Sequence, residues 1–343
     1  MVATLAAPPT FLLEDKFGRR IRNLRVSITD RCNFRCTYCM PAEGLDWLPR
    51  DEILTYEEIE RLARLFVSLG IEELRLTGGE PTVRKDLPTL IRMLAPLRAQ
   101  GLTSLSLTTN GILLDKLAGP LADAGLTRIN VSLDTLDPEK FYAVTRRRAL
   151  DQVLAGLEAL ERYPSISPIK VNAVAVRGFT TEEDVLALAG LARRKPYSVR
   201  FIEYMPLDAE GNWNMDQVIS GEELRAMIER RWPLAPVSGI DPSSTSVVYR
   251  FTDGTGEMGF INPVSQPFCA TCDRIRLTAD GQLRTCLFSI DETDLKGPLR
   301  RGAGDADLAE IVRAAVWVKE KKHKINEGDA FQRASRSMSQ IGG

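Results

Sequence analysis

Between Arg22 and about Pro206, short runs rich in β-branched and aliphatic residues alternate with segments whose apolar residues recur at helical spacing. The strand-like runs are Leu24–Thr29, Glu73–Thr77, Ser104–Thr108, Arg128–Leu133, Ile169–Val176 and Val199–Tyr204. The helical segments between them are Tyr56–Leu69, Leu87–Arg98, Leu113–Ala124, Leu150–Glu161 and Glu182–Arg193. This alternation predicts a parallel sheet covered by helices. Because a complete barrel needs eight such units, we expect either a partial barrel or an open doubly wound sheet.

The alternation of strand-like and helical segments stops after Pro206. We expect a helix over Gly221–Arg230, a hairpin of Val247–Phe251 and Met258–Ile261, a second hairpin of Arg274–Leu277 and Gln282–Thr285, and a helix over Leu308–Lys319. Asp280-Gly281 in the second hairpin is a dipeptide typical of tight β-turns. The charge run from Lys319 to Lys324 is typical of a solvated surface. The sequence therefore predicts an α+β extension after the parallel sheet.

Composition limits the partners that the protein attracts. The 45 basic and 46 acidic residues leave a net charge of −1, so no overall field draws the chain to nucleic acid or to a membrane. No run approaches the ~20 apolar residues of a membrane span, and Met1–Thr10 lacks the features of a secretion signal. We expect a cytoplasmic protein, either monomer or homodimer, with a flexible tail over residues 1–16, a barrel over 17–235 and a C-terminal region over 236–343.

All six cysteines fall into two triplets. The first is Cys32, Cys36 and Cys39, directly after the first strand; the second is Cys269, Cys272 and Cys286, which flanks the second hairpin. Thiolates suit iron–sulfur clusters, zinc or copper(I). A four-iron cluster normally takes four cysteines, so three would leave one iron open, as in catalytic rather than structural metal sites. A zinc site, with His323 as the one available histidine, and redox or structural thiols are the alternatives.

Small and polar residues follow the predicted strands. The strand ends read Thr29-Asp30-Arg31-Cys32, Thr77-Gly78-Gly79-Glu80-Pro81, Thr108-Thr109-Asn110-Gly111, Ser132-Leu133-Asp134 and Glu203-Tyr204-Met205-Pro206. Ligands of parallel β/α folds bind at the carboxyl ends of the strands. Such residues also form ordinary turns, but their repetition after a metal motif favours a site for a polar cofactor.

A phosphate-rich ligand would need dispersed cations in this chain. The phosphate-binding loop pattern of P-loop proteins does not occur in the sequence. Arginine pairs with phosphate in a bidentate manner, and Arg25 and Arg75 lie within predicted strands. Arg274 and Arg276 alternate with Ile275, so both point to one face of a strand beside the second triplet.

Two sequence features make the chain recognisable. The Cys-x3-Cys-x2-Cys loop has an aromatic residue, Tyr38, before its last cysteine, and in this it resembles the radical S-adenosylmethionine superfamily. The second triplet and the ending Ile341-Gly342-Gly343 are similar to those of the GTP 3′,8-cyclase family of molybdenum-cofactor biosynthesis. The resemblance runs from about Phe17 to the last residue. It implies an α/β fold, an incomplete (β/α)6 TIM-like barrel with a C-terminal α+β extension that carries a second iron–sulfur cluster.

The resemblance also implies roles for individual residues. Cys32, Cys36 and Cys39 would be the catalytic residues and hold one [4Fe-4S] cluster, and Cys269, Cys272 and Cys286 would hold the other. S-adenosylmethionine would contact Tyr38, Gly79, Ser132 and Met205. GTP would contact Arg25, Arg75, Thr108, Lys170, Arg274, Ile275 and Arg276. The double glycine at the C-terminus would reach into the active site. The chain departs from the family at Arg146, where we expect a glycine after Thr145.

The implied reaction cleaves S-adenosylmethionine to methionine and 5′-deoxyadenosine and converts GTP to (8S)-3′,8-cyclo-7,8-dihydroguanosine 5′-triphosphate. The implied partners are an electron donor and the cyclic pyranopterin monophosphate synthase that acts next. Two alternatives stay open at this point. One is a radical enzyme of different specificity, such as one that modifies peptides; the other is an electron carrier or a zinc-stabilised binding module without catalysis.

Overall fold

The computed structural model describes residues 12–328, 331–333 and 336–342. Its centre is a parallel run of strands whose order in the sheet follows the order of the chain. The strands are β1 (Asn23–Ser27), β2 (Glu73–Thr77), β3 (Ser104–Thr109), β4 (Arg128–Ser132), β5 (Ile169–Ala175) and β6 (Tyr197–Glu203). A doubly wound sheet would reverse its order at a switch point. The sequential order confirms the partial barrel and excludes the doubly wound alternative.

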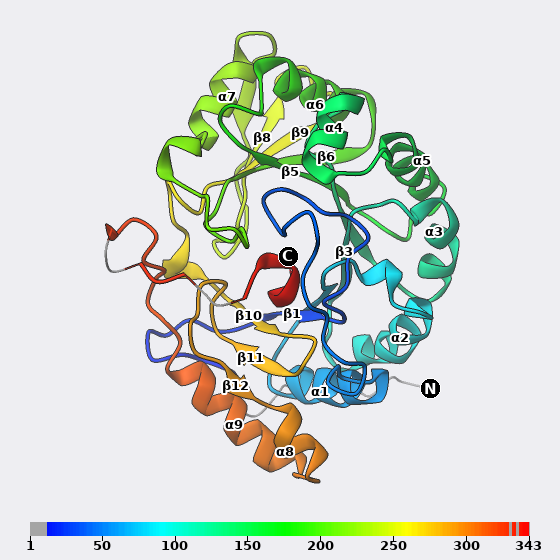
Figure 1. Cartoon of the computed structure of the whole chain (residues 1–343), viewed down its shortest axis with the longest axis vertical. Coiled ribbons are helices and arrows are strands. Elements are labelled where there is room, and N and C mark those ends of the chain that lie inside the picture. Colours follow the sequence, from blue (N-terminus) through cyan, green and yellow to red (C-terminus); the bar gives the residue numbers. More distant parts are fainter. Residues whose placement is uncertain (1–11, 329–330, 334–335, 343) are drawn as a thin grey trace.

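Helices lie along the outside of this curved sheet (Figure 1). They are α1 (Tyr56–Ser68), α2 (Leu87–Leu94), α3 (Leu114–Asp123), α4 (Pro138–Thr145), α5 (Leu150–Leu160) and α6 (Glu182–Arg194), with short 3-10 turns η1 (Pro81–Val83) and η2 (Ala95–Gln100). The sequence analysis missed α4, whose eight residues are too few to show a clear helical period. The start of α4 does have a sequence signal: Asp137 directly precedes Pro138, and its carboxylate accepts hydrogen bonds from the backbone N–H groups of Glu139 and Lys140.

The C-terminal region completes the sheet at both edges. Its elements are η3 (Met215–Gln217), α7 (Gly221–Glu229), β7 (Leu234–Pro236), β8 (Val247–Phe251), β9 (Glu257–Ile261), η4 (Cys269–Thr271), β10 (Arg274–Leu277), β11 (Gln282–Arg284), β12 (Thr293–Asp294), α8 (Lys296–Arg300), α9 (Asp305–Trp317) and α10 (Met338–Ile341). Both predicted hairpins form, and β9 pairs parallel to β6 while β10 pairs parallel to β1. The extension therefore places the second cysteine triplet beside the first strand of the barrel.

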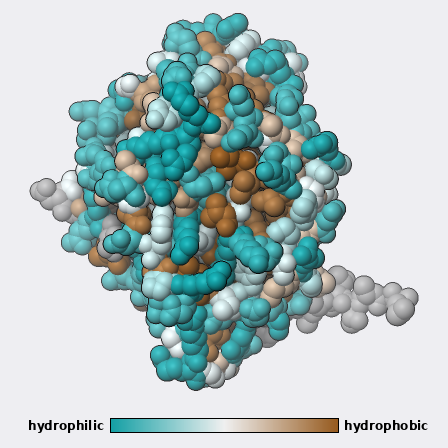
Figure 2. All heavy atoms as spheres, turned by 45° about the vertical axis from the view of Figure 1, so that its right-hand side comes forward, coloured by the Kyte–Doolittle hydropathy of each residue, from teal (hydrophilic) through white to brown (hydrophobic). Residues whose placement is uncertain are grey.

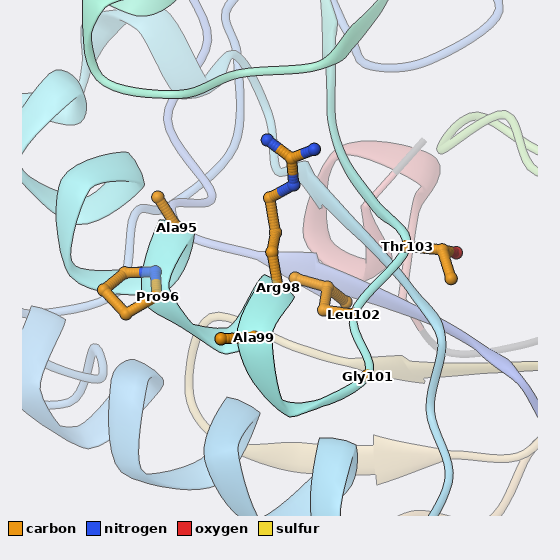
Figure 3. Close-up of a pocket in the computed structure, with 7 residues that line it drawn as sticks. All are labelled: Ala95, Pro96, Arg98, Ala99, Gly101, Leu102 and Thr103. Carbon is orange, nitrogen blue, oxygen red and sulfur yellow. The ribbon is translucent and has the colours of Figure 1, made fainter. Parts of the chain in front are cut away.

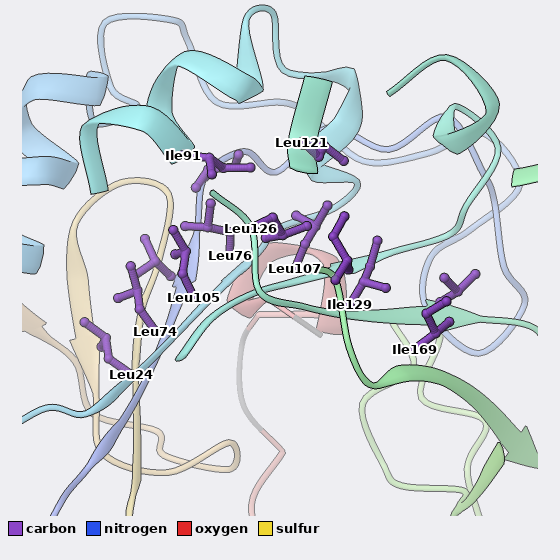
Figure 4. Packing of buried hydrophobic residues seen from close by; sticks show 14 of the residues in the cluster. Leu24, Leu74, Leu76, Ile91, Leu105, Leu107, Leu121, Leu126, Ile129 and Ile169 are labelled. Carbon is purple, nitrogen blue, oxygen red and sulfur yellow. The ribbon is translucent and has the colours of Figure 1, made fainter. Parts of the chain in front are cut away.

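The hydrophobic core lies between the sheet and the outer helices. Leu24, Leu74, Leu105 and Ile129 occupy the helix-facing side of successive strands and are completely buried (Figure 4). Because side chains alternate along a strand, the residues between them face the inside of the barrel. The face of the molecule shown in Figure 2 is largely hydrophilic, with hydrophobic side chains gathered near its middle.

Two expectations about surface segments are wrong. Residues 12–16 do not form a free tail: Leu13 is buried in the core and Asp15 makes a buried ion pair with Arg19 at 2.6 Å. The charge run from Lys319 is not uniformly solvated, since Lys319 is only 1% exposed.

Residues 1–11 of the predicted tail, and Gly343, lie outside the described residues. No helix in the described ranges is long and apolar enough to cross a membrane. The predicted division at residue 235 stays a prediction, and β7 spans it.

Candidate active site

The loop that carries the first triplet follows β1 and folds back on itself. The backbone N–H groups of Cys39 and Met40 both donate to the carbonyl of Cys36, at 2.9 and 3.0 Å. The guanidinium of Arg35 donates to the carbonyl of Cys32 and lies 5.4 Å from the ring of Trp47. These contacts fix the loop between the first and last cysteines.

The Gly-Gly-Glu-Pro segment after β2 packs directly against the residues before Cys32. The N–H of Gly79 donates to the carbonyl of Thr29 at 2.7 Å. A Cβ atom on Gly79 would lie 2.4 Å from the carbonyl oxygens of Asp30 and Arg31, so only glycine fits there. The N–H of Gly79 thus holds the cysteine loop.

Glu80 ties together the loops that follow β2 and β3. Its buried carboxylate accepts hydrogen bonds from the Thr109 hydroxyl at 2.7 Å and from the backbone N–H of Asn110 at 2.6 Å. Burial raises the pKa of Glu80, while these hydrogen bonds oppose that rise. The carboxylate thus acts as a rigid internal brace next to the cysteine loop.

Arg146 clamps the cysteine loop from the outside. It adopts a left-handed backbone conformation with φ of 55°, which explains why a glycine is expected at this position. Its guanidinium donates to the carbonyls of Arg35 at 2.9 Å and Met40 at 3.3 Å. The departure from glycine therefore adds a direct hold on the loop of the first triplet.

Tyr38 does not project freely into a cavity. Its hydroxyl donates to the carboxylate of Asp134 at 2.7 Å, and the other oxygen of Asp134 accepts from the N–H of Val174 at 2.8 Å. Burial raises the pKa of Asp134 to about 6. Ser132 ends β4 and is the register partner of Asn172 on β5. The predicted contacts of Tyr38, Gly79 and Ser132 with S-adenosylmethionine stay predictions.

The thiols of the first triplet are largely shielded from solvent. Burial raises the pKa of Cys32 to about 12, that of Cys39 to about 11, and that of Cys36 well above its usual range. Hydrogen bonds from Ser339 oppose the rise at Cys39. Ser339 belongs to α10, so the C-terminal segment touches the first triplet.

The second triplet forms part of the wall of a cavity of about 520 Å³ inside the barrel. Cys269, Cys272 and Cys286 line it together with six of the residues predicted to bind ligands: Arg25, Arg75, Thr108, Lys170, Arg274 and Arg276. Met205, predicted to contact S-adenosylmethionine, also lines it. The fold therefore brings the second triplet and the dispersed cations to one place. Of the residues predicted to contact GTP, Ile275 differs: its side chain is completely buried in the core, on the opposite face of β10. Tyr38, Gly79 and Ser132, predicted to contact S-adenosylmethionine, are not among the residues that line this cavity.

Cations of neighbouring strands stand side by side in this cavity. Arg276 of β10 is the register partner of Arg25 on β1, which in turn is the partner of Arg75 on β2. Like charges placed directly opposite each other destabilise a sheet. Within the described ranges, none of these three has an ion pair with a carboxylate, and the Arg25 Nε has no hydrogen-bond partner. The arrangement is that of a site for a polyanion.

Burial and mutual repulsion weaken the hold of these cations on their protons. Burial lowers the pKa of Arg75 to about 10 and that of Arg276 to about 9, and neighbouring cations add to the effect. Burial, followed by Arg200 and Arg128, lowers the pKa of Lys170 to about 6. An anionic ligand in the cavity would reverse these shifts.

The sequence analysis missed Arg200. This residue lies on β6 in register with Asn172, lines the same cavity, and its Nε atom is buried without a partner. Burial lowers its pKa to about 10. The available signal was its place in Val199–Tyr204, where Arg200 interrupts an apolar strand just as Arg25 and Arg75 do.

The C-terminal helix α10 lies inside the barrel, where it is drawn in red beside the C label (Figure 1). The guanidinium of Arg276 donates to the carbonyl of Gly342. A Cβ atom on Gly342 would lie 2.3 Å from the Thr77 hydroxyl, and its φ is +80°. Arg336 anchors the segment through ion pairs with Asp280 and Glu292, both at 2.8 Å.

A second hollow, of about 550 Å³, lies on the outside of the barrel at η2 (Figure 3). Arg98 is the one charged residue that lines it, next to Ala95, Pro96 and Leu102. It brings no thiol, carboxylate or group of cations together. The inner cavity is therefore the candidate active site.

Both triplets have the donors that an iron–sulfur cluster requires. All six thiols are free, so none is engaged in a disulfide in this structure. Within the described ranges, no three histidine, cysteine or carboxylate side chains are grouped to hold a single metal ion. A four-iron cluster places each thiolate on a different iron, so its ligands do not meet at one ion. At the second triplet, soft thiols in a cavity wall beside several cations fit an anionic cluster.

Comparison with known proteins places the two halves of the chain in related families. Residues 26–190 match the radical SAM superfamily, and residues 197–325 match the family described as Molybdenum Cofactor Synthesis C. The GTP 3′,8-cyclase of Moorella thermoacetica is 45% identical over 331 residues, which cover 96% of this chain and 100% of that protein. The GTP 3′,8-cyclase of Mycobacterium ulcerans is 46% identical and covers 98% of this chain and 94% of that protein.

Solved structures show the same fold at low sequence identity. Native anSMEcpe with bound AdoMet has a TM-score of 0.60 at 15% identity, covering 88% of this chain and 82% of that one. Streptococcus suis SuiB bound to the precursor peptide SuiA has a TM-score of 0.59 at 15% identity, covering 96% of this chain and 76% of that one. At this identity the likeness concerns the fold alone.

Proposed function

Because the chain belongs to the GTP 3′,8-cyclase family of radical S-adenosylmethionine enzymes, we propose that it converts GTP to (8S)-3′,8-cyclo-7,8-dihydroguanosine 5′-triphosphate. S-adenosylmethionine is consumed to methionine and 5′-deoxyadenosine. This is the first step of molybdenum-cofactor biosynthesis, in line with the match of the C-terminal half.

The observation that carries the proposal is the row Arg276, Arg25 and Arg75. Three neighbouring guanidinium groups in register, without carboxylate partners in the described ranges, need an anion of several charges. A nucleoside triphosphate supplies those charges and fits a cavity of about 520 Å³. Thr108 and Asn130, which are joined by a hydrogen bond of 3.2 Å, add polar contacts on the same wall.

Each cysteine triplet would hold one [4Fe-4S] cluster. The superfamily implies one such cluster together with S-adenosylmethionine, and Cys32, Cys36 and Cys39 carry its sequence motif. The second cluster, on Cys269, Cys272 and Cys286, is our proposal, supported by their position in the cavity wall. When bound, the clusters supply electron transfer at the first triplet and an open iron for the guanine at the second.

The chain itself positions and encloses the reactants. The cations would hold the triphosphate in the cavity. The C-terminal helix α10 reaches both the first triplet and the cavity, because Ser339 contacts Cys39 while Met338 lines the cavity. In this position α10 would help to exclude water from the reacting atoms, as the control of reactive chemistry requires.

The reaction balances with an external electron donor. The C3′–H bond of GTP breaks, its hydrogen passes to 5′-deoxyadenosine, and a bond forms between C3′ and C8. The product is an isomer of GTP, since C8 keeps its hydrogen and N7 gains one from solvent in place of the hydrogen that C3′ loses to 5′-deoxyadenosine. The whole reaction therefore requires two electrons and one proton: one electron for the cleavage of S-adenosylmethionine, and the other electron with the proton to complete the product. The partners that we propose are this donor and the cyclic pyranopterin monophosphate synthase that takes the product.

Iron stoichiometry tests the proposed second cluster. Anaerobic reconstitution of the full chain should give about eight irons, two four-iron clusters. The variant with Cys269, Cys272 and Cys286 changed to alanine should keep about half of that iron and still bind S-adenosylmethionine. Four irons in the wild-type chain would show that the second cluster is absent and would favour a radical enzyme of different specificity. A chain that holds zinc and does not cleave S-adenosylmethionine would contradict the proposal that it is a radical enzyme.

A further inference from the structure

Lys319 is a buried cation at the second cysteine triplet. Its side chain is among the largest completely buried ones, with 1% of the residue exposed. The ammonium donates to the carbonyl of Arg274 at 3.0 Å and to the carbonyl of Thr285. These two carbonyls lie two residues after Cys272 and one residue before Cys286. The ammonium is therefore held between the two chain segments that carry the thiols.

The described residues give this ammonium no carboxylate partner. The nearest acidic side chain in the sequence, Glu320, is engaged elsewhere: its carboxylate accepts from the hydroxyls of Thr285 at 2.7 Å and Ser289. Burying an ammonium without a counter-charge is costly. Two neutral carbonyls satisfy hydrogen bonds but bring no negative charge, so this site favours an anion.

The Lys319 charge is placed to act on the three thiols. The carbonyls that its ammonium contacts belong to the two chain segments that carry Cys272 and Cys286. Both of these thiols line one cavity together with Cys269. The buried ammonium therefore lies at the second triplet.

We propose that Lys319 is the resident counter-charge of the second cysteine triplet and raises the reduction potential of the iron–sulfur cluster bound there. The inference rests on the second cluster of the proposed function. It assigns a positioning and tuning role to a residue that contacts neither GTP nor, as a ligand, the iron.

The physical argument concerns the sign of the cluster charge. Three thiolates and a [4Fe-4S] core carry net negative charge, and reduction by one electron adds to it. A fixed positive charge in a low-dielectric site stabilises the reduced state more than the oxidised state. Removing that charge should make the cluster harder to reduce and weaken its binding. Changing the hydrogen bonds alone should affect folding rather than the potential.

The test uses the full chain with Cys32, Cys36 and Cys39 changed to alanine, so that only the second triplet holds iron. Into this background we would introduce Lys319→Gln, which keeps two N–H donors without the charge, and Lys319→Arg, which keeps the charge. Lys324→Gln is the matched control, since that lysine lies on the same segment and is exposed. The readouts are iron per chain after anaerobic reconstitution and the midpoint potential, followed by electron paramagnetic resonance during titration with dithionite.

We expect Lys319→Gln to lower the equilibrium ratio of reduced to oxidised cluster at least tenfold at a fixed potential, a shift of ~59 mV for one electron, and to retain less iron. Lys319→Arg and Lys324→Gln should stay close to the parent. An unchanged potential in iron-loaded Lys319→Gln would overturn the inference. Should Lys319→Gln not load iron at all, equal loss in Lys319→Arg would also overturn it. Failure of the parent to assemble a cluster would instead contradict the proposed function.

Discussion

Arg25 on β1 and Arg276 on β10 are direct neighbours in parallel register, and the carbonyl of Gly342 accepts a hydrogen bond from Arg276. The same guanidinium thus faces another cation on one side and the end of the chain on the other. Arg276 therefore connects the proposed triphosphate site to the C-terminal segment.

Arg276→Met should weaken GTP binding about tenfold to hundredfold, because each charge-assisted hydrogen bond contributes roughly 1.5–3 kcal/mol. The same change should raise the melting temperature of the ligand-free protein, since it removes repulsion from Arg25. Thermal unfolding with and without GTP measures both effects. Arg64→Met, at an exposed helical position, is the control for loss of charge. A variant that binds GTP normally would remove Arg276 from the site.

Lys170 should link GTP binding to proton uptake. In the free protein its pKa is lowered to about 6 by burial and by neighbouring cations, so the amine is neutral at higher pH. The triphosphate restores the charged form, and the complex therefore takes up a proton. By linkage, affinity should fall as the pH rises above 6. Calorimetry in buffers of different ionisation enthalpy measures the uptake. GTP exchanges protons of its own on binding, and the proton uptake beyond that amount should vanish in Lys170→Met. If this additional uptake persists in Lys170→Met, another group takes up the proton.

Gly342→Ala should displace the C-terminal segment and lower turnover about a hundredfold, as misplacement by about 1 Å can do. The added Cβ would lie 2.3 Å from the Thr77 hydroxyl. Gly254→Ala is the matched control, because Gly254 has nearly the same φ, +79°, with nothing within 4 Å of the added atom. Turnover measured at saturating GTP distinguishes the clash from backbone strain. Equal losses in both variants would contradict the role of the clash.

Arg146 allows backbone strain and side-chain contact to be separated. Arg146→Gly and Arg146→Ala both lose the donors to the carbonyls of Arg35 and Met40, so both should release iron from the first triplet faster than the parent. Arg146→Gly should unfold at a higher denaturant concentration than Arg146→Ala, because alanine in the left-handed conformation retains about 1 kcal/mol of strain. Arg148→Ala, an exposed position, should release iron at the parental rate. Slow release from Arg146→Gly would show that the guanidinium does not hold the loop.

The fold was predictable from the sequence because each strand of the barrel is short and its helix amphipathic. Both hairpins were predictable from their turn residues, such as Asp280-Gly281. What the sequence analysis missed were local exceptions. The helix α4 is too short for a period, and Leu13 belongs to a segment whose burial depends on residues far along the chain.

The candidate site was predictable where residue type and spacing carry the chemistry, as in the six cysteines and in Arg25, Arg75 and Arg276. The contact of Ile275 with GTP stays a prediction, and its side chain faces the core because side chains alternate along a strand. The prediction of a solvated charge run is wrong at Lys319, because tertiary packing buries this residue at the second triplet. Register between distant strands, as for Arg200, is visible only in the folded sheet.

Turnover of GTP deuterated at C3′ is the most direct test that GTP is the substrate. Under anaerobic conditions with S-adenosylmethionine and dithionite, we expect 5′-deoxyadenosine that carries deuterium, together with a product of the same mass as GTP after correction for the label. Without GTP, little S-adenosylmethionine should be cleaved. Unlabelled 5′-deoxyadenosine, or equal cleavage with and without GTP, would contradict the assignment of GTP as the substrate.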